Sequence, residues 1–237
     1  MARLHRDVLR VLASDIVSGR RATGELLPRE VDVSEQFGVS RGVARETIRA
    51  MEERGLVTVK HGKGATVNPA ERWSVFDPDV FAAMLEGERA TEVLTHYLEC
   101  RRILEVEAAG LAAERADEED LREAADALRR MEESASGPPG RSTEERFHAA
   151  DVAFHGALVE AAGNRALGGL VDRLHAALLI ARHALAQPRF RVERALPEHR
   201  RILDAVVAGD PQEARAAMRD HLDTVASYLR EQEAARG

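Results

Sequence analysis

The chain has 237 residues and a net charge of −7, and 44% of its residues are hydrophobic but only 4% aromatic, which predicts one or two helix-rich folded domains. Its single cysteine, Cys100, excludes an internal disulfide and a cysteine-rich zinc module, and its place in a helical pattern predicts that it is buried. No apolar stretch is long enough to span a membrane and the N-terminus lacks a signal-peptide pattern, so we expect a cytoplasmic protein.

The N-terminal part of the chain predicts a small mixed domain over residues 1–68. Apolar spacing and turn residues predict helices over residues 4–18, 30–36 and 41–54 and strands over residues 56–59 and 65–67. Gly38 lies between the second and third helices, where a positive φ is often required, and Ser40 is placed to cap the third. A helix-turn-helix followed by a hairpin is a winged helix-turn-helix.

The third predicted helix carries Arg41, Arg45 and Arg49 at four-residue spacing, which places them on one face. A recognition helix needs such a face, because it packs with its apolar side and enters the major groove of DNA with the other. Local charge agrees: residues 1–68 hold 12 Lys and Arg against 9 Asp and Glu, whereas the remaining residues hold 22 against 32. An ordinary solvated arginine face is the alternative interpretation.

The rest of the chain predicts a linker over residues 69–89 and a helical domain over residues 90–237. Glycine and proline separate six predicted helices, over residues 91–115, 118–134, 142–163, 165–186, 191–208 and 210–233. The fold is therefore expected to be mainly α, with the winged helix-turn-helix followed by an all-α bundle of six or seven helices.

A candidate metal site lies in the helical domain. Asp151 and His155 are four residues apart and so share a helix face, and His199 and His221 lie on two later helices. Three imidazoles and one carboxylate from a bundle suit a divalent ion, either zinc or nickel, iron or manganese, with positions left for water or a ligand. The spacing alone is also compatible with four ordinary helix residues that bind no metal. That interpretation is retained for the other histidines of this domain: His96, His148, His175 and His183.

The N-terminal segment GELLPREVDVSEQFGVSRGVARETIRAMEERGLVTVKHGKGATV resembles the winged helix-turn-helix of the GntR superfamily of regulators, over about residues 4–68. The resemblance implies that six residues contact DNA: Ser40, Arg41, Gly42, Arg45, His61 and Gly62. We add Arg49, because it lies on the same arginine face of the third helix. The family often has an arginine where this chain has Val31, so that contact is lost or moves to Arg29. Gly42 stands where a hydroxyl residue is common, which predicts a different base preference.

The C-terminal segments YLECRRILEVEAAGLAAERADEEDL, DVAFHGALVEAAGN and EHRRILDAVVAGDPQEARAAMRDHL resemble the FCD sensor domain of the fatty-acid-regulator branch of that superfamily, over about residues 90–232. The resemblance implies a metal, zinc in the first place, on Asp151, His155, His199 and His221. It also implies that Arg101 faces a bound effector.

Together these patterns predict a homodimeric transcription regulator, a repressor that a small carboxylic acid releases from a short inverted repeat in double-stranded DNA. Residues 71–80, ERWSVFDPDV, resemble members that sense sugar acids. Two alternatives belong to other classes. A metal-dependent hydrolase would use the ion to activate water, but it needs a general base for which no motif appears, so we expect no enzyme. An architectural DNA-binding protein would need no ligand.

Overall fold

The computed structural model describes residues 2–60, 63–87, 89–138, 140–180 and 189–234. The chain divides into two compact units, residues 1–93 and residues 94–237, each with its own buried core. Among the described residues, no helix combines the length and the apolar character that crossing a membrane requires.

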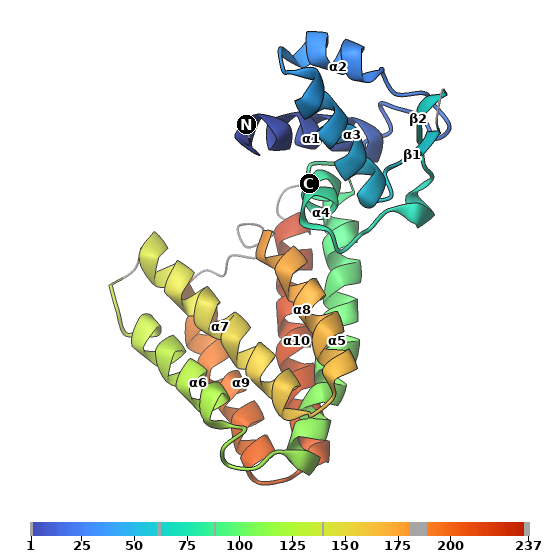
Figure 1. Ribbon diagram of the computed structural model, residues 1–237. Helices are drawn as coiled ribbons and strands as arrows, with labels where there is room; N and C mark the ends of the chain where they lie inside the picture. Colours follow the sequence, from blue (N-terminus) through green and yellow to red (C-terminus); the bar gives the residue numbers. More distant parts are fainter. Residues whose placement is uncertain (1, 61–62, 88, 139, 181–188, 235–237) are drawn as a thin grey trace. The chain divides into compact units, whose positions relative to one another are not determined.

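Unit 1 contains the predicted winged helix-turn-helix (Figure 1). Its elements are α1 (Ala2–Val17), α2 (Glu30–Phe37), α3 (Arg41–Glu53), β1 (Val57–Lys60), β2 (Gly64–Val67), the short 3-10 helix η1 (Ala70–Arg72) and α4 (Pro78–Leu85). The strands pair antiparallel with Val57 opposite Val67. Leu12 of α1 and Met51 of α3 are fully buried in the core that joins the helices.

The turn between α2 and α3 has the predicted chemistry. Gly38 ends α2 in the left-handed conformation, at φ 62°, which costs glycine little. The Ser40 hydroxyl accepts a hydrogen bond of 3.3 Å from the backbone N–H of Val43 and caps the first turn of α3. These two residues fix where α2 ends and where α3 begins.

Much of the segment expected to be a linker, residues 69–89, is folded into unit 1. Asp77 caps α4, whose Val80 and Phe81 are fully buried, and α4 packs against α1. Arg54 bonds Asp77 at 3.0 Å and Asp79 at 2.7 Å and so ties α4 to the end of α3. Unit 1 accordingly extends to Val93. An eight-residue helix shows too few turns for its apolar period to stand out in the sequence.

Unit 2 is a bundle of helices, which confirms the expected fold class. Its described helices are α5 (Ala90–Arg115, in unit 2 from Leu94), α6 (Arg122–Ala135), α7 (Arg141–Ala161), α8 (Arg165–Ile180), α9 (Arg189–Val207) and α10 (Pro211–Ala234). Helix α7 packs against α6 and α8, and α9 packs against α6 and α10 (Figure 1). The predicted end of the fourth helix, with His183, lies outside the described residues.

Helix α5 is joined to α10 by charged side chains. Arg102 lies 2.6 Å from Asp223, and Arg215 lies 3.0 Å from Glu107. A Cβ on Gly110 would lie 2.3 Å from the guanidinium carbon of Arg215, so a larger residue there would require the Arg215 side chain to shift. The prediction that Cys100 is buried is wrong: it is exposed, because α5 buries the face that carries residues such as Tyr97.

Candidate metal centre and nucleic-acid interface

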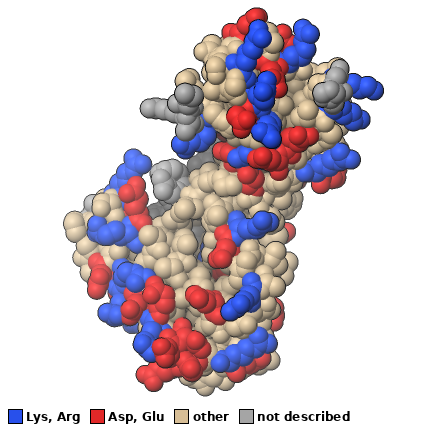
Figure 2. All heavy atoms as spheres, viewed as in Figure 1, with Lys and Arg blue, Asp and Glu red and all other residues tan. Residues whose placement is uncertain are grey.

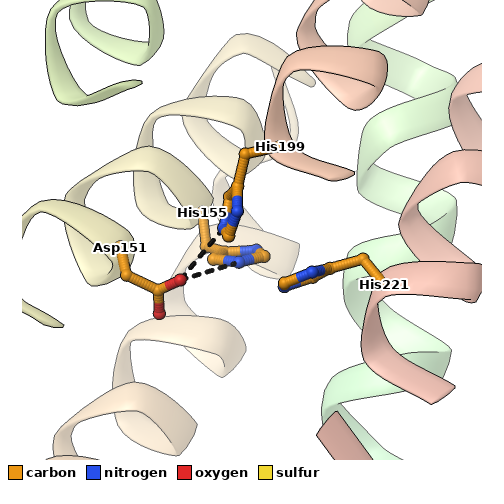
Figure 3. A group of neighbouring side chains, drawn as sticks. All are labelled: Asp151, His155, His199 and His221. Atoms are coloured by element: carbon orange, nitrogen blue, oxygen red, sulfur yellow. Dashed lines mark ion pairs between the residues drawn. The ribbon is translucent and has the colours of Figure 1, made fainter. Parts of the chain in front are cut away.

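The structure brings the four predicted metal ligands together. Asp151 and His155 occupy successive turns of α7, His199 comes from α9 and His221 from α10 (Figure 3). One ligand atom from each residue lies within 4.8 Å of the other three, and the three histidines are buried. Asp151 Oδ1 lies 3.0 Å from His199 Nε2 and 3.9 Å from His155 Nε2. A single ion could therefore contact all four side chains.

The far side of each imidazole faces an oxygen atom. The contacts are His155 Nδ1 to Glu105 Oε2 at 2.7 Å, His199 Nδ1 to the Ala195 carbonyl oxygen at 2.7 Å, and His221 Nδ1 to Glu198 Oε2 at 2.9 Å. Carboxylates and carbonyls only accept hydrogen bonds, so they favour the proton on Nδ1 and leave the lone pair on Nε2.

The Nε2 atoms of His155 and His199 are buried and make no hydrogen bond of good geometry among the described residues; both face Asp151 Oδ1, and an ionised carboxylate has no proton to donate to a ring lone pair. Leaving such atoms unsatisfied is costly, and a bound cation would satisfy them. Three nitrogens and one carboxylate oxygen fit zinc, and they also fit nickel, iron or manganese. The residues present therefore fit the implied metal.

Electrostatics favours the protonation states that a metal needs. Burial lowers the pKa of His155 to about 3 and holds the pKa of His221 well below its usual value, so both rings are neutral at physiological pH. Burial alone would raise the pKa of Asp151, but its contacts with His199 and His155 hold that pKa well below the usual range. Neutral imidazoles and an ionised carboxylate are the forms that coordinate metal ions.

The predicted effector residue, Arg101 on α5, belongs to the same buried cluster. Its Nε donates to Glu105 Oε1 at 2.7 Å, and His175 Nε2 lies 2.7 Å from that oxygen. Burial would raise the pKa of Glu105, but the charge of Arg101 and the contact with His155 hold it well below its usual range. Burial would lower the pKa of Arg101, and Glu105 and Asp151 raise it. Both groups are therefore charged.

Glu105 and Glu198 were not predicted from the sequence as residues of the site. Glu105 lies one helical turn after Arg101, and Glu198 directly precedes His199. Both positions are compatible with a supporting role, but 41 of the residues are acidic, so a glutamate next to a candidate ligand carries little signal.

The predicted DNA-binding face is exposed on α3. This helix buries Ala44, Ile48 and Met51, whereas Arg45 and Arg49 have 63% and 68% of their side chains exposed. Arg45 Nε lies 3.2 Å from Glu30, and Arg49 pairs with Glu46. Exposed ion pairs of this kind are weak, so DNA phosphates could replace the glutamates as partners of the two arginines. Figure 2 shows Lys and Arg beside Asp and Glu on the surface of the molecule.

The other predicted DNA contacts lie around the same helix. Arg41 and Gly42 are exposed at the start of α3, directly after the capping Ser40. Arg29 precedes α2, with its side chain mostly exposed and 3.4 Å from Asp32. The strands β1 and β2 lead to the tip of the wing, but His61 and Gly62 lie outside the described residues.

Comparison with known families agrees with both halves of this description. Residues 4–67 match the family of bacterial regulatory proteins named gntR, and residues 96–224 match the FCD domain. The chain is 34% identical to the HTH-type transcriptional regulator LutR of Bacillus subtilis, over 90% of this chain and 95% of that protein. It is 29% identical to the galactonate operon transcriptional repressor of Escherichia coli, over 92% of each.

Solved structures show the same fold. A Listeria monocytogenes protein, Lar, described as controlling expression of the agr system, aligns over 96% of each chain with a TM-score of 0.68 and 18% identity. A GntR protein of Streptococcus agalactiae aligns over 94% of this chain and 99% of that one with a TM-score of 0.53 and 22% identity. The sequence relatives are named as transcription regulators, which supports the expectation that the chain is not an enzyme. This chain therefore belongs to the GntR family of bacterial transcription regulators and carries an FCD domain after its winged helix-turn-helix.

Proposed function

We propose that the protein is a homodimeric repressor that leaves its operator when a small carboxylic acid binds beside a divalent metal ion in unit 2. The observation that carries this proposal is the convergence of Asp151, His155, His199 and His221 in one buried cluster with Arg101. Zinc, the first choice for this ligand set, would supply a second positive centre with a coordination position that a carboxylate can take.

Arg101 is suited to hold the carboxylate. In the hydrogen bonds of the described residues it uses only Nε, toward Glu105, so its two terminal nitrogens can serve a ligand. A guanidinium stays charged when buried and matches a carboxylate with two parallel hydrogen bonds. Sugar acids such as galactonate or gluconate lead the candidates, because a similar protein is named as a galactonate operon repressor. Residues 71–80 also resemble family members that sense sugar acids.

Release from DNA requires that the effector bind two arrangements of the chain with different affinities. An effector moves the protein off DNA only if it binds one arrangement of the chain more tightly than another, since equal affinity shifts no population. An architectural protein would lack this response and a hydrolase would consume the compound.

A thermal-shift screen tests the proposal directly. Sugar acids and other small carboxylic acids are expected to raise the melting temperature of zinc-loaded protein more than that of metal-free protein, because a ligand that binds only the folded state stabilises it. The same acids should release labelled operator DNA in a gel-shift assay. If no carboxylic acid does either with zinc-loaded protein, the proposed effector class is wrong.

The first prediction concerns Arg45, which lies in the N-terminal half of α3. Arg45→Ala is expected to weaken operator binding by about 1–3 kcal/mol, or roughly 5- to 150-fold, with relaxed specificity at one base pair, if Arg45 contacts a guanine. Gel-shift titration at one salt concentration measures the change. Arg20→Ala is the matched control, because Arg20 is also exposed and paired, with Asp15, but lies outside α3. Equal affinity of the two variants would contradict the assignment.

The second prediction concerns assembly. One recognition helix reads too few base pairs for a specific operator, so we expect a homodimer that protects a short inverted repeat. Light scattering should give twice the chain mass of 26.0 kDa, and footprinting should show two half-sites. A monomer that still binds one half-site tightly would refute this expectation.

A further inference from the structure

Glu105 lies between the candidate metal ligands and Arg101. It is fully buried on α5, and both of its carboxylate oxygens are in contact with basic side chains. Oε1 accepts from Arg101 Nε at 2.7 Å and lies 2.7 Å from His175 Nε2, whereas Oε2 lies 2.7 Å from His155 Nδ1. One carboxylate thus contacts side chains from α5, α7 and α8.

We propose that Glu105 is a positioning residue: it holds the ring proton of His155 on Nδ1, so that Nε2 is presented to the metal, and it ties this ligand to Arg101. The inference rests on the proposed function for the roles of the metal and of Arg101. It adds a residue that links the two.

The contact with His155 can select one form of the ring. An ionised carboxylate has no proton to donate, so a nitrogen 2.7 Å away is favourable only when that nitrogen carries the proton. Both His155 Nδ1 and Glu105 Oε2 are buried and neither makes a hydrogen bond to another described residue, so the 2.7 Å contact is the one through which each can be satisfied. Leaving buried polar atoms unsatisfied is costly, which favours the ring form that carries its proton on Nδ1 at this contact.

Sharing one carboxylate links the two binding events. A ligand that pulls Arg101 toward itself alters the contact at Oε1, and Glu105 is a single rigid carboxylate, so the contact of Oε2 with His155 changes as well. Binding of the metal and binding of the carboxylate should then change each other's affinity by the same factor. Glu198 provides the comparison: it contacts His221 Nδ1 at 2.9 Å and Thr224 at 3.2 Å, and Arg101 is not among its hydrogen-bond partners in the described residues.

Glu105→Gln is the informative variant because it keeps the shape and replaces one acceptor oxygen by an NH₂ group. If its remaining oxygen serves Arg101 and His175, the NH₂ group faces His155 Nδ1 and moves the ring proton to Nε2. Glu198→Gln is the matched control, with the same change beside His221.

Two measurements decide the proposal. Nitrogen-15 NMR of metal-free protein reports which ring nitrogen carries the proton, and competition with a chelator gives the zinc affinity. We expect Glu105→Gln to move the proton of His155 only and to lower zinc affinity by about 10- to 100-fold, and Glu198→Gln to move the proton of His221 only. A proton on Nε2 of His155 in the wild-type, metal-free protein would overturn the proposal, and this result does not depend on whether a variant folds. Unchanged zinc affinity in folded Glu105→Gln would also overturn it.

The link to Arg101 is tested with galactonate as the probe, by calorimetric titration with and without saturating zinc. We expect saturating zinc to raise galactonate affinity by about 5-fold or more in the wild type and in Glu198→Gln, and by clearly less in Glu105→Gln, where only direct coordination of the acid to zinc remains. Retention of the full effect in Glu105→Gln would overturn the link. If galactonate binds none of the zinc-loaded proteins, the sugar-acid part of the proposed function fails, and the proton position on His155 still decides the role of Glu105.

Discussion

His199→Ala and His221→Ala are each expected to abolish metal binding and the effector response, while operator binding is retained. Each change removes one of three converging imidazoles, and the loss of zinc affinity should exceed the roughly 10- to 100-fold cost of removing a supporting residue. Elemental analysis of purified protein gives the metal content, and gel-shift assays with increasing effector give the response. The α3 face that we assign to DNA is in unit 1, so its arginines are untouched.

His96→Ala is the control for this experiment, because His96 is also a histidine of the helical region but is exposed and outside the cluster. It should keep the metal and the response. Zinc should raise the melting temperature of the wild type and of His96→Ala, and it should leave that of His199→Ala unchanged. One bound metal ion per chain in His199→Ala would show that the cluster is not the site.

Arg101→Lys is expected to abolish or strongly weaken the effector response while the protein stays folded and metal-loaded. Lysine keeps the positive charge beside the buried Glu105 but lacks the planar guanidinium that holds a carboxylate with two hydrogen bonds. We expect the effector concentration for operator release to rise by about tenfold or more, equivalent to about 1.4 kcal/mol of lost binding free energy. Release at the wild-type concentration would remove Arg101 from the effector site.

Arg101→Ala should behave differently from Arg101→Lys. It leaves the charged and fully buried Glu105 without the guanidinium that lies 2.7 Å away, and breaking a buried pair in this way typically costs about 3–5 kcal/mol. The free energy of unfolding, measured by urea titration, should therefore fall in Arg101→Ala far more than in Arg101→Lys. Equal stability of the two variants would mean that Arg101 does not stabilise Glu105.

The features predicted correctly from sequence are those with a local cause. Gly38 and Ser40 mark the turn and the cap within a few residues of each other, and both act in the structure as predicted. The four candidate ligands were identified because Asp151 and His155 repeat at the helical spacing and because the chain resembles the FCD domain. Turn and capping residues, together with the family resemblance, were enough to predict the order of the domains.

The features that sequence could not reveal depend on contacts between distant segments. Glu105 contacts His175, which is 70 residues away along the chain, and no sequence feature near Glu105 predicts that contact. Helix α4 becomes part of unit 1 because it buries Val80 and packs against α1, and because Arg54 pairs with Asp77 and Asp79, which are 23 and 25 residues later. Tertiary packing, rather than local preference, determines both features.

The charges around the three imidazoles also determine how much positive charge a metal must bring to make the site neutral. Among the described residues of this cluster, Glu105, Asp151 and Glu198 contribute three negative charges and Arg101 one positive charge, so this set carries a net charge of −2 when its histidines are neutral. Arg194, 3.7 Å from Glu198, is mostly exposed and compensates little. A divalent cation brings the cluster to zero, whereas a monovalent cation leaves a residual charge in a poorly solvated interior. Removing the metal from the folded protein should therefore destabilise unit 2, even where no effector or DNA is present.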